Sequence, residues 1–71
     1  MPDQTNIVLR TRDRELAHDV ARQLAGLTRH VFAIQRYDAR TFQVVPQARE
    51  VRTRDLNTFR ALAANISRLE N

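Results

Sequence analysis

Residues 31–46 read VFAIQRYDARTFQVVP, and this stretch decides the fold that the sequence predicts. Over residues 30–38, Phe32 and Ile34 alternate with Val31 and Ala33 on opposite faces, and after the short link Asp38–Arg40 the chain returns through Phe42, Val44 and Val45. A period of two is typical of half-buried strands, so two such segments joined by a short link predict a β-hairpin. Pro46 has no amide hydrogen, and it therefore either ends the second strand or places that strand at an edge of the sheet.

Amphipathic helices are predicted on both sides of this hairpin. Apolar residues recur at three- and four-residue steps after Asp13 and again after Thr53, which is the spacing of a helix with one buried stripe. The two stripes are Leu16, Ala17, Val20, Ala21, Leu24 and Leu27, then Leu56, Phe59, Leu62, Ala63, Ile66 and Leu69.

Capping residues are found near the ends of both predicted helices. Thr11 or Asp13 is expected to accept the unpaired amide hydrogens at the start of the first helix. Thr53 or Asp55 is expected to do the same for the second helix. Gly26, the only glycine, is expected to end the first helix in the left-handed conformation.

The remaining segments complete an α+β pattern. A polar lead over 1–4 precedes an expected strand over 5–10, where Ile7, Val8 and Leu9 are apolar. A weak, charged final strand is considered over 47–52. The order is therefore β-α-β-β-(β)-α, which predicts a two-layer sandwich with both helices on one face of a three- or four-stranded sheet.

The optional strand separates two architectures. Without it, the order is the split βαβ of a ferredoxin-like half. With it, everything after the first strand has the α-β-β-β-α order of double-stranded-RNA-binding domains. The chain lacks the glycine-rich loops and the lysine-rich second-helix start of those domains, and no family is recognised from its residues.

Composition limits the class of protein. The 71 residues are 42% hydrophobic and 28% charged, ordinary usage for a globular chain, so one domain over 1–71 is expected. The absence of cysteine excludes disulfides and thiolate metal sites. No apolar run is long enough for a membrane span or a signal core, so we expect a cytoplasmic protein.

The basic residues favour polyanionic partners. The formal net charge is +4, and all twelve basic residues are arginine, which binds phosphate through a bidentate fork. A GC-rich bacterial or phage genome would give the same arginine usage through codon bias. Arginine content alone is therefore not evidence of nucleic-acid binding.

Arginines gather at the two predicted strand-to-helix junctions, where LRTRD at 9–13 recurs as VRTRD at 51–55. A helix start flanked by arginine suits phosphate, and a cation there opposes the helix dipole unless an anion is near. Asp13 and Asp55 supply local negative charge, so capping chemistry explains the repeat equally well. The candidate polyanion-binding residues are Arg10, Arg12, Arg14, Arg52 and Arg54.

Catalytic side chains are sparse. His18 and Asp19 are adjacent on a helix and point in different directions, and His30 begins a strand, so no metal-ligand spacing is complete. Ser67 is the only serine, and a single glycine cannot build a phosphate-cradling loop. We therefore expect a non-enzymatic domain with no catalytic residues, no metal and no cofactor.

The aromatic residues do not predict base stacking. The sheet-face aromatic pattern of an RNA-recognition motif is missing. Phe32, Phe42 and Phe59 are assigned to the core, and Tyr37 to the hairpin end, where its hydroxyl reaches water.

The predicted strands carry apolar residues on both faces, with Val8, Val31, Ala33 and Val45 on the side away from the helices. Self-association through this face or through a strand edge would cover them, which predicts a homodimer. A short sheet can also expose small apolar residues without a partner. The leading hypothesis is a binding domain for nucleic acid or another polyanion, and the alternative is a homodimeric protein-interaction or assembly module.

Overall fold

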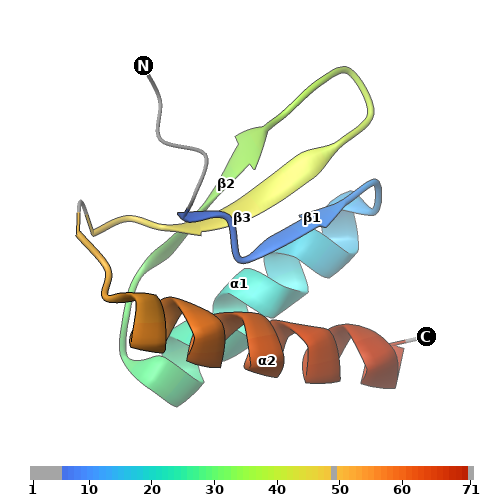
Figure 1. The fold of residues 1–71 in the computed structure, drawn as a ribbon. Coiled ribbons are helices and arrows are strands. Elements are labelled where there is room, and N and C mark those ends of the chain that lie inside the picture. The colour runs from blue at the N-terminus through green and yellow to red at the C-terminus, as the bar shows by residue number, and fades with distance from the viewer. Residues whose placement is uncertain (1–5, 49, 71) are drawn as a thin grey trace.

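The structure is a computed structural model that describes residues 6–48 and 50–70, and it has the order β-α-β-β-α (Figure 1). The elements are β1 (Leu9–Thr11), α1 (Arg14–Thr28), β2 (Phe32–Arg36), β3 (Phe42–Pro46) and α2 (Thr53–Glu70). Both helices lie on one face of a three-stranded sheet, so the predicted α+β sandwich is confirmed. The polar lead expected over 1–4 lies outside the described residues.

The strand order is β1-β3-β2, and both pairings are antiparallel. Strands β1 and β2 are therefore parallel to each other and are separated by β3, which is the split βαβ arrangement. The weak strand considered over 47–52 is absent from the described residues of that segment, where residues 47, 48 and 50–52 lie outside the sheet. Arg49 lies outside the described residues.

Pro46 ends β3, as one of its two predicted roles required, but β3 is the central strand rather than an edge. The Gln47 N–H donates to the Val31 carbonyl, and the Tyr37 N–H to the Thr41 carbonyl, both at 2.9 Å. Odd-numbered residues of β3 thus bond to β2, and the nitrogen of Pro46 is directed towards β1. The missing donor lies where β1 has not begun, because β1 starts opposite Val44.

Strand β1 begins later than the predicted first strand over 5–10. By the observed register Ile7 would lie opposite Pro46, which cannot donate a hydrogen bond, and the Ile7 carbonyl instead accepts from Arg60 Nε at 3.0 Å. Leu9 is the register partner of Val44, yet the Val8 N–H also donates to the Val44 carbonyl at 2.9 Å. Val8 and Leu9 therefore both lie opposite Val44, which is the arrangement of a β-bulge.

This bulge explains why Val8 belongs to the core. Val8 is buried and Leu9 is packed against the same cluster, so the prediction that Val8 lies on the outer face is wrong. Adjacent strand residues normally point to opposite faces, and an extra residue in one strand removes that alternation.

The core lies between the sheet and both helices. Val20 and Leu24 of α1 and Val44 of β3 have fully buried side chains, each contributing about 1.5–3 kcal/mol through burial. Phe59 of α2 is buried and meets Phe32 edge to face, with ring centroids 5.1 Å apart.

The helix stripes are confirmed except at their last positions. Leu27 and Leu69 are 64% and 87% exposed, although both were expected in the core. They occupy the final turns of α1 and α2, beyond the area that the sheet and the other helix cover. Phe42 and Phe32 are partly buried against the core, as predicted.

The ends of α1 agree only in part with those predicted from the sequence. Asp13 Oδ1 accepts the Leu16 N–H at 3.1 Å, which confirms the predicted cap. Gly26 lies inside the helix, and the left-handed residue is Arg29, with φ of 61°. The helix thus runs two residues past Gly26 to Thr28, whose Oγ1 donates to the Leu24 carbonyl at 2.7 Å.

Helix α2 begins differently from its prediction. The Leu56 N–H donates to the Arg52 carbonyl at 2.9 Å, so Arg52 precedes the first hydrogen-bonded turn. Thr53 and Asp55 lie inside that turn instead of capping it. The Asp55 carboxylate still favours the helix start, because negative charge is stabilised at the positive end of the helix dipole.

Substituting Gly26→Ala is expected to stabilise the protein. A Cβ atom at Gly26 meets nothing within 4 Å, and alanine favours the helix interior over glycine by roughly 0.5–1 kcal/mol. Thermal unfolding followed by circular dichroism should show a melting temperature higher by about 4 °C. A fall in the melting temperature would indicate a left-handed Gly26 and contradict this helix end.

Candidate functional site

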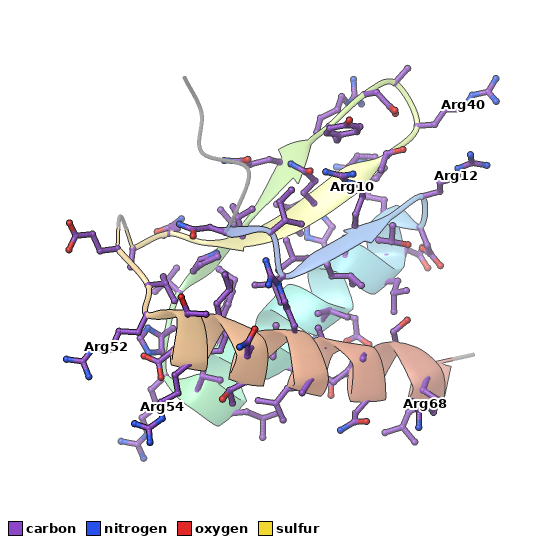
Figure 2. All side chains as sticks on the ribbon, in the orientation of Figure 1. Arg10, Arg12, Arg40, Arg52, Arg54 and Arg68 are labelled. Atoms are coloured by element: carbon purple, nitrogen blue, oxygen red, sulfur yellow. The ribbon has the colours of Figure 1, made fainter. Side chains whose placement is uncertain are left out.

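The five arginines predicted to bind a polyanion do not form one surface. Arg10 and Arg12 come from β1 and its end, at the side of the molecule that holds the β2–β3 link (Figure 2). Arg52 and Arg54 lie at the start of α2, at the opposite end (Figure 2). The two junctions are separated because α1 and α2 run in opposite directions beneath the sheet (Figure 1).

The sheet face opposite the helices carries a polar row. Arg10 of β1, Gln43 of β3 and Gln35 of β2 are register partners, so their side chains share this face. Ala33 and Val45 form the next pair along and are half-buried. The open face is thus polar across the middle of the sheet, and less apolar than the sequence indicates.

Gln43 fixes the position of Arg10. The side chain lies on the central strand, only 3% exposed, and its Oε1 accepts from Arg10 Nε at 3.1 Å and Nη2 at 2.9 Å. No buried side-chain nitrogen or oxygen in the described residues lacks a hydrogen-bond partner. Arg10 is therefore held by a buried amide group while its own side chain remains at the surface.

Tyr37 stacks on the same guanidinium. The Arg10 Cζ lies 4.0 Å from the centroid of the Tyr37 ring, within the range of a cation–π contact. Tyr37 follows the end of β2 and is 52% exposed. The chain thus builds a stack in which a buried amide orients a guanidinium, and the guanidinium supports a half-exposed ring.

Two further cations lie beside this stack. Arg12 and Arg40 are exposed and lie near each other at the same end of the sheet (Figure 2). Neither forms a salt bridge within residues 6–48 and 50–70. We call Arg10, Arg12, Tyr37 and Arg40 the hairpin-end cluster.

One carboxylate lies within this region. Asp38 Oδ1 accepts the Arg40 N–H at 2.8 Å, and this hydrogen bond is the largest cause of the lowered pKa of Asp38. Hydrogen bonds from Thr41 and the positive charge of Arg12 lower that pKa further. Asp38 is therefore ionised at neutral pH. Its hydrogen bond to the Arg40 backbone stabilises the β2–β3 link that carries Arg40.

Sequence reasoning missed Arg40, Gln43 and the stacking of Tyr37. Tyr37 was placed correctly at the hairpin end, but its contact is with Arg10, 27 positions earlier in the chain, through the β1–β3 pairing. A usable signal was the isolated glutamine in an otherwise apolar central strand, because a buried amide requires a hydrogen-bonding partner.

The second arginine junction has a different structure. Val51 and Arg52 are not in a strand, so the expected strand-to-helix junction is absent at this position. Residues 50–55 include the carboxylates of Glu50 and Asp55 as well as Arg52 and Arg54. Two positive side chains are thus accompanied by two negative ones in this segment.

Arg14 contributes to a separate surface. A depression over the first turns of α1 is lined by Asp13, Arg14, Glu15, Leu16, His18, Asp19 and Arg22. Asp19 Oδ1 accepts from Arg22 Nη2 at 2.7 Å, and its Oδ2 accepts from Gln23 at 3.2 Å. Three carboxylates against two guanidiniums make this depression unfavourable for a polyanion.

The histidines lie apart. His18 is on the exposed side of α1, whereas His30 packs edge-on against Phe59, with ring centroids 5.2 Å apart. In the part of the chain that the structure describes, no group of three His, Cys, Asp or Glu residues could hold a metal ion. Neither described helix is long and apolar enough to cross a membrane.

Comparison with known proteins gives no assignment. No protein-family model matches the chain, and no match is found among curated proteins or solved structures. The function is therefore argued from the residues of the hairpin-end cluster.

Proposed function

We propose that this chain is a non-enzymatic binding domain for a polyanion, nucleic acid foremost, and that the hairpin-end cluster is its binding site. The observation that carries the proposal is that Arg12 and Arg40 lie near each other at one end of the sheet, with Arg10 over the open face on the same side (Figure 2). Arg40 comes from a segment far from Arg10 and Arg12 in the sequence. Three guanidiniums stand here with the carboxylate of Asp38, and Asp13 follows Arg12 in the chain, so positive side chains outnumber negative ones where a phosphate would approach.

Arg10 is the central residue of this site. Its hydrogen-bonding partner is a neutral amide and its stacking partner is a neutral ring, so its positive charge is held in place without being neutralised. An orientation fixed in advance reduces the entropy that binding must remove from a long side chain. A guanidinium presents several donors, and those not bonded to Gln43 remain for phosphate oxygens.

A second candidate function is the homodimeric module. Strand β2 is an edge strand, and the backbone groups of Phe32, Ile34 and Arg36 point away from β3. Val31, which directly precedes β2, has an apolar side chain that is 62% exposed. Antiparallel pairing of two β2 edges across a twofold axis would extend the sheet and cover this side chain.

Charge reversal tests the polyanion site. The double variant Arg12→Glu/Arg40→Glu is expected to abolish binding to a labelled oligonucleotide, whereas Arg54→Glu/Arg68→Glu should retain most of it. Each pair changes the formal net charge by four, from +4 to zero, so the comparison separates position from total charge. Fluorescence anisotropy at several salt concentrations would measure both effects.

The salt dependence provides the second readout of the same experiment. With about three phosphate contacts, affinity for a single strand should fall about 20-fold between about 50 and about 200 mM salt. Removing contacts at the hairpin end should flatten this dependence. Equal loss of binding in both double variants would show that net charge acts without a site, and no binding at low salt would refute the polyanion proposal.

Sedimentation equilibrium tests the dimer. If β2 pairs with a second copy, the protein should be dimeric at roughly tens of micromolar and above. Val31→Asp should shift the equilibrium to monomer, because an unpaired charge would be buried next to the paired edges. Leu69→Asp, at a still more exposed apolar residue in α2, is the control. A monomer at about millimolar concentration would exclude this module.

A further inference from the structure

We propose that Tyr37 stacks an unpaired nucleobase, so that the hairpin-end cluster binds single-stranded nucleic acid in preference to a duplex. The inference rests on the proposed function, because Arg12 and Arg40 would hold the phosphates of the same strand. The inference adds a nucleobase to the ligand, which binding of phosphate alone would not require.

The ring of Tyr37 contacts Arg10 and is also exposed to solvent. Arg10 lies 4.0 Å from the ring centroid, and yet about half of the residue remains open to solvent, at 52% exposure. An exposed aromatic ring loses favourable burial unless something flat and apolar covers it. A base fits this requirement, because every base has a π-face that stacks on an aromatic side chain.

The fold itself fixes Arg10 against the Tyr37 ring. Gln43 is 3% exposed and holds both Arg10 Nε and Nη2, so the guanidinium cannot swing away from the ring without breaking two hydrogen bonds. Tyr37 itself is tied to the hairpin by the hydrogen bond from its backbone N–H to the Thr41 carbonyl. The stack is therefore arranged before any ligand arrives, and binding a base does not have to order it.

The surroundings favour a single strand. In a duplex the bases are stacked on one another and cannot place a face on an exposed side chain, whereas unpaired bases can be splayed onto one. Gln35 of the polar row is exposed on the open face and offers its amide group to base edges. Arg12 and Arg40 lie near each other at the end of the sheet, where the backbone of the strand would pass (Figure 2).

Intrinsic fluorescence gives a direct test, because Tyr37 is the only tyrosine and the chain has no tryptophan. Titration with a single-stranded thymidine 15-mer should quench tyrosine emission as the base stacks. A 15-mer of abasic sites carries the same phosphates without bases. It is expected to bind more weakly and to leave the emission unchanged.

Variants of Tyr37 complete the test, with binding measured by anisotropy of a labelled strand and folding checked by circular dichroism. Tyr37→Leu should weaken binding of the thymidine strand roughly tenfold or more, the effect of losing one stacked base, and weaken binding of the abasic strand much less. Tyr37→Phe keeps the ring and should retain the affinity within about threefold. The corresponding duplex should bind more weakly than the single strand.

The outcomes separate the two proposals. Equal binding of the thymidine and abasic strands, or an equal loss for both in Tyr37→Leu, would overturn the stacking inference and leave the polyanion site standing. Tighter binding of the duplex would also overturn it. Absence of binding to every strand at low salt would refute the polyanion site and the stacking inference together.

Discussion

The double pairing of β3 is the constraint on which the rest of the structure depends. The even-numbered side chains of β3 point to the core, and on the opposite face Gln43 is flanked by Arg10 of β1 and Gln35 of β2. Val44 thereby packs fully buried beneath the helices, and Gln43 is buried on the opposite face. A buried amide group must be hydrogen-bonded, and Arg10 meets that requirement. The same pairing therefore builds the core and positions the cation that supports Tyr37.

The placement of charge also follows from the connections between elements. The crossover from β1 to β2 through α1 puts the end of β1 beside the β2–β3 link, so Arg12 and Arg40 become neighbours. Strand β3 runs antiparallel to β1 and β2, so the start of α2 that follows it lies at the opposite end of the molecule, together with Arg54 (Figure 2). Two sequence segments that look alike are thus placed in different surroundings. Asp13 caps α1, whereas the aligned Asp55 lies inside the first turn of α2, so the likeness does not extend to capping geometry.

Local patterns predicted the local structure. The three- and four-residue spacing from Leu16 to Leu24 defines α1, and the alternation around Ile34 defines the hairpin, because both depend on near neighbours in sequence. The predicted end of α1 was wrong because Arg29, and not Gly26, takes the left-handed conformation. The bulge at Val8 and the Arg10–Tyr37 contact depend on the pairing of distant strands, which periodicity does not encode.

The most direct test of this account is the NMR signal of the Arg10 Nε–Hε group in the free protein. This group donates to Gln43, and the neighbouring Arg10 Cζ lies 4.0 Å from the Tyr37 ring centroid, so the signal should exchange slowly with water and shift upfield through the ring current. In Gln43→Leu both properties should be lost, while the signal of exposed Arg68 stays unchanged. An Arg10 signal that already matches Arg68 in the unsubstituted protein would contradict the preformed stack and the constraint from which it is derived.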